Sequence, residues 1–204
     1  MKLSEAVRGV SGTLAADGEF SCIAFATEQE QSQFLTFLEK EKFLPALDNS
    51  KISCVLTTSA LAEKIPPHIK GVFLCDRPKA ALFEIHNRLA RHPDYVGASA
   101  ATVVGEGCSI SPLAAIDCEN VVIGDRVTIE PFVVIKGRVI IGNDVTIRSG
   151  AVIGCKGFSF SKDAQGQNVS VEDTARIIIE DHVEIFEQVA ISTGIFPWEE
   201  TRIG

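Results

Sequence analysis

The sequence has no apolar run of eighteen residues and no basic start followed by an apolar segment. It therefore predicts neither a membrane-spanning helix nor a signal peptide. It also lacks any Cys-x-x-Cys pair, although six cysteines are present: Cys22, Cys54, Cys75, Cys108, Cys118 and Cys155. Scattered cysteines of this kind are typical of reduced, buried thiols, so we expect a cytoplasmic protein without disulfides or structural zinc.

Positive charge is also scarce. The 204 residues include 19 Lys and Arg against 27 Asp and Glu, which gives a net charge of −8. Such a chain cannot neutralise phosphates in bulk, so its composition argues against a nucleic-acid partner. The length allows one or two domains with a substantial core.

The sequence does contain an aliphatic residue at every sixth position from about Ala98 to Gly204, with a slip of one residue between Ile116 and Ile123. These residues are Val104, Ile110, Ile116, Ile123, Ile129, Ile135, Ile141, Ile147, Ile153, Ile179, Ile185, Ile191 and Ile203. Neither a helix nor an ordinary strand has a period of six, whereas a parallel β-helix stacks short repeats of fixed length. Three such hexads would form one triangular coil, with the aliphatic side chains inside.

Two further patterns accompany the hexads. Small or branched residues recur four places after the aliphatic positions, at Cys108, Ala114, Val127, Val133, Val139, Val145, Ala151, Val183 and Val189. Gly105, Gly124, Gly142 and Gly154 directly follow aliphatic positions, and Gly124-Asp125 and Asn143-Asp144 supply turn chemistry there. The predicted fold class is therefore mainly β: a left-handed parallel β-helix over residues 95–204, preceded by a small α/β domain over residues 1–94.

The first 94 residues carry no hexad pattern. Apolar runs predict strands at residues 20–25, 34–38, 52–57 and 72–75. Ser4 is expected to cap a short helix over residues 5–7, and residues 59–64 look helical. Pro78 should open a helix that reaches about Arg91, with one apolar face.

Two segments depart from the repeat. An excursion over residues 154–178 begins with Gly-Cys-Lys-Gly-Phe-Ser-Phe and continues through the polar stretch Asp163-Ala164-Gln165-Gly166. A loop of this length inside a compact array is usually functional. Later, Pro197-Trp198 replaces a hexad position, while the phase survives to Ile203.

The order of these features resembles a known family. A small front domain precedes the repeats, the Gly-x-x-Gly-Phe-x-Phe loop starts at Gly154, and Arg-Ile-Ile-Ile-Glu-Asp-His-Val-Glu-Ile follows at residues 176–185. With the spacing from Ile191 to Ile203 over Ser192-Thr193-Gly194, these stretches are similar to the UDP-3-O-(3-hydroxyacyl)glucosamine N-acyltransferases of bacterial lipid A synthesis. The loop and the coil after it are the specific part, because many acyltransferases share bare hexads.

The resemblance implies an enzyme that moves a hydroxyacyl chain from acyl carrier protein to the 2-amino group of a UDP-linked acylglucosamine. Acyl-coenzyme A stays open as the donor. The resemblance also implies a cytoplasmic homotrimer with active sites between neighbouring β-helices and with no bound cofactor or metal. In the family two aromatics stack on the uracil, and by position these are Phe37 and Phe43. Gly157, Phe158 and Phe160 of the loop are further substrate-binding candidates.

The two front-domain phenylalanines also have a purely structural interpretation. Phe37 would then be a core strand residue, and Phe43 would pack beside Leu44. Lys40-Glu41 stands where the family has part of an Asn-Pro-Lys core, so both interpretations stay open.

The catalytic residue is expected outside this sequence. The family's general base is a histidine of a later coil, which takes the proton from the attacking amine. The chain ends at Gly204 before such a coil, so we expect the front part of a longer enzyme. His182 is the one histidine within the repeats, and its position three residues after Ile179 favours a solvent-facing corner residue.

Charged residues of the repeats favour structural roles. Glu130 and Arg148 each follow an aliphatic position and should lie one coil apart, at the strand spacing of about 4.8 Å. Solvated surface is favoured over steering of phosphates or an acidic carrier protein for Lys136, Arg138, Lys156 and Lys162.

Two other functions stay open. An acetyl-CoA-dependent N-acetyltransferase of nucleotide amino sugars is less favoured, because those relatives have a dinucleotide-type front domain and no Gly-x-Gly-x-x-Gly occurs here. A catalytically silent binding or scaffold trimer is compatible with the missing base. A metal-dependent hydratase is rejected, since it needs three converging histidines and the repeats hold one.

Overall fold

The computed structural model describes residues 1–162 and 166–204. Asp163, Ala164 and Gln165, part of the expected polar stretch, lie outside the described residues. The chain divides into two compact units. Unit 1 comprises Met1–Arg91 and Ser159–Val171, and unit 2 comprises His92–Phe158 and Glu172–Gly204. The middle of the excursion thus groups with unit 1, although the sequence places it inside the repeats.

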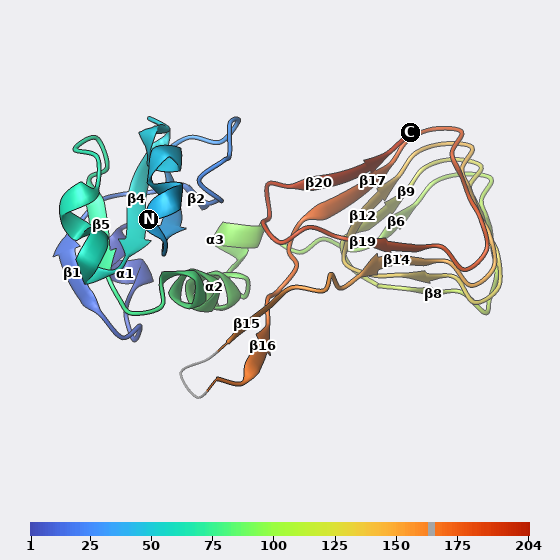
Figure 1. Cartoon of the computed structure of the whole chain (residues 1–204). Coiled ribbons are helices and arrows are strands. Elements are labelled where there is room, and N and C mark those ends of the chain that lie inside the picture. Colours follow the sequence, from blue (N-terminus) through green and yellow to red (C-terminus); the bar gives the residue numbers. More distant parts are fainter. Residues whose placement is uncertain (163–165) are drawn as a thin grey trace. The chain divides into compact units, whose positions relative to one another are not determined.

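Unit 1 is built on a five-stranded sheet with the strand order β1-β5-β4-β3-β2 (Figure 1). β1 runs antiparallel to β5, and the other neighbours are parallel. The strands are β1 (Thr13–Ala16), β2 (Cys22–Ile23), β3 (Phe34–Leu38), β4 (Ile52–Thr57) and β5 (Gly71–Leu74). The α-helices are α1 (Leu3–Ala6) and α2 (Pro78–Leu89), and the 3-10 helices are η1 (Glu41–Asp48) and η2 (Ser59–Lys64). A hairpin of β15 (Phe160–Lys162) and β16 (Asn168–Ser170) groups with them.

The core of unit 1 lies around β3, β4 and α2. Strands of a parallel sheet are covered on both faces, so their apolar runs are buried almost without alternation. In β3, Phe34 and Leu35 are fully buried, and α2 packs on β3 and β4. The apolar face expected for this helix is confirmed, because Leu82, Ile85 and Leu89 are all buried.

The N-terminal helix differs from the prediction. α1 spans Leu3–Ala6 and is preceded by Lys2, so Ser4 is not its cap. The Ser4 hydroxyl donates instead to Asp17 Oδ2 at 2.8 Å, and its backbone N–H donates to Asp17 Oδ1 at 3.0 Å. These hydrogen bonds, the backbone one first, hold the pKa of Asp17 below its usual range. Ser4 was wrongly assigned because a carboxylate distant in sequence takes its hydroxyl.

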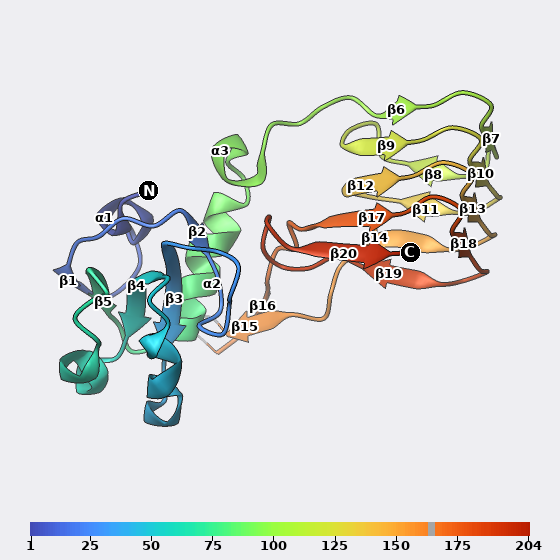
Figure 2. The ribbon, with the colours of Figure 1, turned by 90° about the horizontal axis from the view of Figure 1, so that it is seen from above.

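Unit 2 consists of three sheets whose paired strands are all parallel. The first contains β6 (Val103–Val104), β9 (Val121–Ile123), β12 (Arg138–Ile141), β17 (Arg176–Ile179) and β20 (Glu200–Ile203). The second contains β7 (Ser109–Ile110), β10 (Thr128–Ile129), β13 (Thr146–Ile147) and β18 (Glu184–Ile185). The third contains β8 (Ala115–Ile116), β11 (Val134–Ile135), β14 (Val152–Cys155) and β19 (Ala190–Ser192). The chain visits the three sheets in turn after the short helix α3 (Pro93–Val96), which makes a parallel β-helix (Figure 2).

The hexad residues stack in register inside this β-helix. Ile129 pairs with Ile110 on one side and Ile147 on the other, and equivalent columns run through the other two sheets. The central members are at most 2% exposed, whereas Val104 in the first coil is 48% exposed because no earlier coil covers it. The period of six therefore marks the side chains that fill the core of the solenoid.

One corner of the β-helix shows why glycine follows the aliphatic position. Gly105, Gly124 and Gly142 approach one another closely in successive coils. A Cβ atom on Gly124 would lie 2.6 Å from the carbonyl oxygen of Gly142. Only glycine allows this approach of backbone to backbone.

The residues after these glycines form a ladder of side-chain hydrogen bonds between coils. Asn143 Oδ1 accepts from the backbone N–H of Asp125 at 2.9 Å. Asp181 Oδ1 in turn accepts from the N–H of Asn143 at 2.7 Å. The turn chemistry expected at this corner is confirmed, and it also joins one coil to the next.

The second departure from the repeat, residues 193–199, adds apolar packing. Phe196 is fully buried and stacks on Trp198, with ring centroids 5.9 Å apart and planes 13° from parallel. Among the helices of the described chain, none is both long and apolar enough to cross a membrane.

Candidate functional site

The first predicted pair, Phe37 and Phe43, lies in unit 1 where β3 ends and η1 begins. Phe37 is half-buried and meets Phe25 edge to face, with ring centroids 6.5 Å apart and planes at 78°. Phe25 meets Phe83 of α2 in the same way at 6.4 Å. Phe37 is therefore part of an aromatic cluster that joins β3 to α2.

Phe43 lies in a different environment. It sits in the first turn of η1 and is 55% exposed. The ammonium of Lys42 lies 4.8 Å from its ring centroid, a cation–π distance. Because β2 to β5 are parallel, η1 begins at the edge formed by their carboxyl ends, which is where open α/β sheets bind ligands. Phe43 thus offers an accessible aromatic face at a suitable edge.

Between the two phenylalanines, residues 39–42 are charged and exposed, whereas Leu38 is buried. Lys40 precedes η1 with an extended backbone, and Glu41 forms an ion pair with Lys64 at 2.5 Å. This ion pair joins the first residue of η1 to the last residue of η2 on the solvent-exposed surface. Surface pairs of this kind add little stability, so Lys40 and Glu41 are free to vary without loss of the fold.

The three loop candidates are distributed over both units. Gly157 belongs to unit 2, and its backbone N–H donates to Asp173 Oδ2 at 2.7 Å. Phe158 also belongs to unit 2 and is 95% exposed. Phe160 opens strand β15 in unit 1, opposite Ser170, and is partly exposed. The structure therefore groups Phe160 with Phe37 and Phe43, and places Gly157 and Phe158 on the solenoid.

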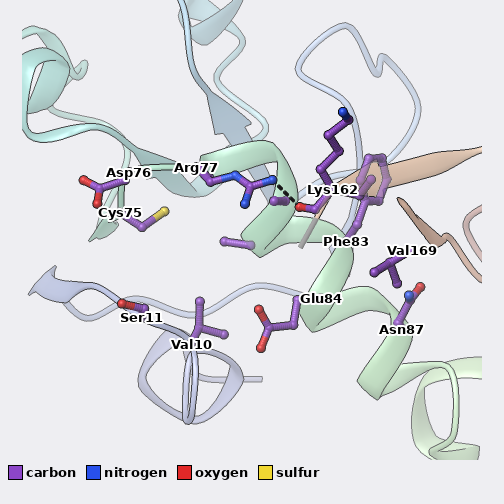
Figure 3. Close-up of a pocket in the computed structure, with 13 residues that line it drawn as sticks. Val10, Ser11, Cys75, Asp76, Arg77, Phe83, Glu84, Asn87, Lys162 and Val169 are labelled. Atoms are coloured by element: carbon purple, nitrogen blue, oxygen red, sulfur yellow. Dashed lines mark hydrogen bonds between the residues drawn. The ribbon is translucent and has the colours of Figure 1, made fainter. Parts of the chain in front are cut away.

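A pocket that the sequence did not indicate lies elsewhere in unit 1 (Figure 3). It has a volume of about 370 Å³ and is open to solvent. Its walls come from the segment after α1, the end of β5, helix α2 and the β15–β16 hairpin. Neither Phe37 nor Phe43 lines it. No local motif marks this pocket, because four separate segments supply its lining.

His182 occupies a corner of the β-helix. Its backbone has a φ of 62°, and its Nδ1 lies 3.9 Å from Asp144 Oδ2. Asp144 is already bound by the Arg126 guanidinium through two hydrogen bonds of 2.7 Å, and these lower the pKa of Asp144. The His182 side chain is 76% exposed. This is a solvent-facing corner position of the β-helix.

Glu130 and Arg148 lie on neighbouring coils, as predicted. Arg148 Nη1 donates to Glu130 Oε1 at 2.9 Å, and its Nε donates to Glu184 Oε1 at 2.7 Å in the following coil. The Arg148 hydrogen bond, followed by two from Ser149, lowers the pKa of Glu130. This is a structural ladder across three coils.

All six cysteines are free thiols. Burial raises the pKa of Cys22 and of Cys54 to about 11, so both are protonated at neutral pH. In the part of the chain that the structure describes, no three His, Cys, Asp or Glu side chains converge as metal ligands would.

Comparison with known proteins points to one group. The family described as Bacterial transferase hexapeptide (six repeats) matches residues 120–155. The UDP-3-O-acylglucosamine N-acyltransferase of Coxiella burnetii (strain RSA 493 / Nine Mile phase I) is 28% identical over 99% of this chain and 65% of the relative. The protein of the same name from Helicobacter hepaticus (strain ATCC 51449 / 3B1) is 31% identical over 92% of this chain and 61% of the relative. The protein of that name from Helicobacter pylori (strain ATCC 700392 / 26695) is 25% identical over 96% of this chain and 64% of the relative.

The similarity extends through both units, so the resemblance predicted from the loop and its neighbours is confirmed. The chain spans between 61% and 65% of the length of these three relatives.

Proposed function

We propose that this chain is part of an N-acyltransferase that moves a hydroxyacyl group from acyl carrier protein to the 2-amino group of a UDP-linked acylglucosamine in lipid A synthesis. The observation that carries this proposal is the similarity over 99% of the chain to a protein named UDP-3-O-acylglucosamine N-acyltransferase. Hexapeptide repeats alone are common to many transferases. Similarity that includes the front unit favours this acceptor.

In this proposal unit 1 holds the uridine. Phe43 presents its exposed face to the uracil ring, and Phe37 supports the same edge of the sheet from its aromatic cluster. Stacking of a base on an aromatic side chain is worth about 1–3 kcal/mol. Gly157, Phe158 and Phe160 are assigned to the acceptor as well, with Phe158 the most accessible of the three.

We also propose a homotrimer, supported by the outward-facing residues of the β-helix. Apolar residues form most of an outer column on the first sheet, at Val103, Val122, Ile140 and Ile178, and the column ends at Arg202. A second apolar column lies on the third sheet, at Ala115, Val134, Val152 and Ala190. The outer column of the second sheet is polar, at Ser109, Thr128, Thr146 and Glu184.

The two apolar columns lie on sheets that meet at one corner, because the chain passes directly from β8 to β9. If the first sheet of one copy packs on the third sheet of the next, two different surfaces meet, and such contacts close into a ring. A left-handed β-helix of triangular section suits a ring of three. Within the 204 residues we assign no catalytic base, and the histidine of a later coil stays a prediction.

Titration with UDP by calorimetry tests the role of unit 1. We expect saturable binding to the 204-residue protein, weakened about tenfold by Phe43→Ala and less by Phe37→Ala. Phe132→Ala, which removes another exposed ring on the solenoid, is the matched control and should bind normally. Absence of UDP binding, or binding unaffected by Phe43→Ala, would count against the proposal.

Acyl transfer tests the rest of the proposal. Hydroxyacyl carrier protein, hydroxyacyl-coenzyme A and acetyl-CoA would each be offered with the UDP-linked amino sugar, and the product followed by mass spectrometry. Preferred use of the carrier protein supports that donor, whereas preferred use of acetyl-CoA supports an N-acetyltransferase. UDP binding without transfer from any donor supports a silent binding protein.

A further inference from the structure

The pocket of unit 1 lies at the same carboxyl edge of the sheet as the proposed uridine site, but neither Phe37 nor Phe43 lines it. It lies at the carboxyl end of β5, where the chain turns through Asp76 and Arg77 into α2. Its volume of about 370 Å³ falls at the small end of the range for small-molecule sites.

The walls of the pocket are mainly apolar. Ala80 and Ala81 in the first turn of α2 leave room that larger side chains would fill, and Phe83 adds an aromatic wall. Val10 lies opposite, and Val169 of the hairpin closes another side. An apolar group bound here would be removed from contact with water on several sides, and this removal favours binding.

Two donor side chains of the lining, those of Arg77 and Asn87, already hold the hairpin. Arg77 donates from Nη2 to the carbonyl oxygen of Lys162 (Figure 3). Asn87 donates from Nδ2 to the carbonyl oxygen of Ser170 at 2.9 Å. The Lys162 ammonium points away from the pocket in Figure 3. Among the described residues of the lining, therefore, neither cation, Arg77 or Lys162, faces Glu84.

The acceptors of the pocket, by contrast, are available. Glu84 projects from α2 beside Val10, and Asp76 lies at the other end of the lining. Within residues 1–162 and 166–204, neither carboxylate has an ion pair or a side-chain hydrogen bond. A carboxylate accepts hydrogen bonds only, so its natural complement is a cationic N–H donor.

We propose that this pocket binds a small organic cation: a primary amine or amidine carried on an aromatic or branched aliphatic body. The body packs against Ala80, Phe83 and Val169, and the nitrogen donates to Glu84. Because the hairpin forms one wall, occupancy also holds β15 and β16 against α2.

The test uses the 204-residue protein and a matched pair of probes, 2-phenylethylamine and 2-phenylethanol, which differ in the charged group. Amide chemical shifts are followed by NMR at neutral pH during titration. We expect the amine to shift amides of residues 10–11, 80–84, 161–162 and 169, and to bind about fivefold more tightly than the alcohol. Both Glu84→Gln and the control Glu63→Gln keep a surface position, so both should fold.

The variants decide the outcome. Glu84→Gln should abolish the preference for the amine while the alcohol binds as before, and Glu63→Gln should retain the preference. Equal binding of amine and alcohol, a preference that survives Glu84→Gln, or no shift in the lining at about 10 mM probe would overturn the proposal, since fragments bind such sites at about millimolar affinity. UDP titration of the same samples reports separately on the uridine proposal.

Discussion

The two units are stabilised in different ways. In the β-helix, a core residue such as Ile147 contacts the equivalent residue of the coil before and the coil after, so the same interaction recurs along the axis. In unit 1, each core contact occurs once: Phe34 of β3 pairs with β2 on one side and β4 on the other, under a single helix. A repeated interaction leaves a period in the sequence, and a single one does not.

Charge divides in the same way. Residues 1–91 contain eleven Lys and Arg and eleven Asp and Glu, whereas residues 92–204 contain eight and sixteen. All of the net charge of −8 therefore belongs to the second region. Several acidic residues there form ladders with arginines and backbone N–H groups of neighbouring coils, as with Glu130 and Arg148. These acids of the solenoid have a structural role.

The largest expected effect tests whether the two units unfold separately. Phe34→Ala removes a fully buried ring from unit 1 and should lower its free energy of unfolding by about 3–5 kcal/mol. Hydrogen exchange should show lost protection in β3 and β4 and unchanged protection in β10 and β13. Phe43→Ala, the same change at an exposed site, should stay within about 0.5 kcal/mol. Equal loss in both units would mean that they unfold together.

The reciprocal change is Ile135→Ala in the central coil. It removes a fully buried side chain with a coil on either side, and should cost about 2–5 kcal/mol. Exchange should accelerate in neighbouring coils, because each coil supports the next. Ile140→Ala, on the outer surface, is the control and should cost less than about 1 kcal/mol in the monomer. Loss confined to one coil would contradict the repeated-contact picture.

The hairpin sharpens the boundary between the two regions, since its sequence lies inside the repeats. Asn87→Ala removes the hydrogen bond from α2 to the Ser170 carbonyl, which should weaken the hairpin by about 1 kcal/mol. Amide exchange of Ser161 and Val169 should then accelerate about fivefold. Arg91→Ala near the end of the same helix is the control. If Asn87→Ala left the hairpin unchanged, the grouping of residues 159–171 with unit 1 would lose its energetic basis.

The smallest expected effect is a loss of solenoid stability at low pH. Hydrogen bonds lower the pKa of three solenoid carboxylates, through Arg148 at Glu130, Arg126 at Asp144 and Arg202 at Glu200. Their folded pKa values lie below the unfolded values, so their stabilisation is complete above about pH 4.3 and is lost as the pH falls through the folded pKa. We expect urea midpoints of the solenoid to fall between pH 5 and pH 3. The urea midpoint of Glu130→Gln should fall less over this pH range. The midpoint of Glu187→Gln, which leaves these ladders intact, should fall as much as that of the unsubstituted protein.

The contrast explains what could be predicted. The β-helix, its core columns and the Glu130–Arg148 contact follow from the hexads, because register repeats from coil to coil. In unit 1 the strand positions from Phe34 to Thr57 and the helix from Pro78 were predictable from local patterns. The pairing of β1 with β5 and the hydrogen bonds of Ser4 were not, since each depends on residues distant in sequence.

The candidate sites also differ in whether they could be predicted from the sequence. Phe37 and Phe43 came from resemblance to a family, and only the fold showed that one is held in an aromatic cluster while the other is exposed. The pocket beside Glu84 had no signal, because its walls are brought together from four segments.

The stacking of the coils in residues 92–158 and 172–204 is predictable from the sequence alone, because an interaction that recurs at a constant interval leaves a constant spacing of Ile and Val. Tertiary structure decided the rest: which phenylalanine faces solvent, where the hairpin from within the repeats is fastened, and which side chains surround a cavity. These features depend on single contacts between segments that are distant in sequence. Because such a contact occurs only once, it leaves no periodic pattern in the sequence from which it could be predicted.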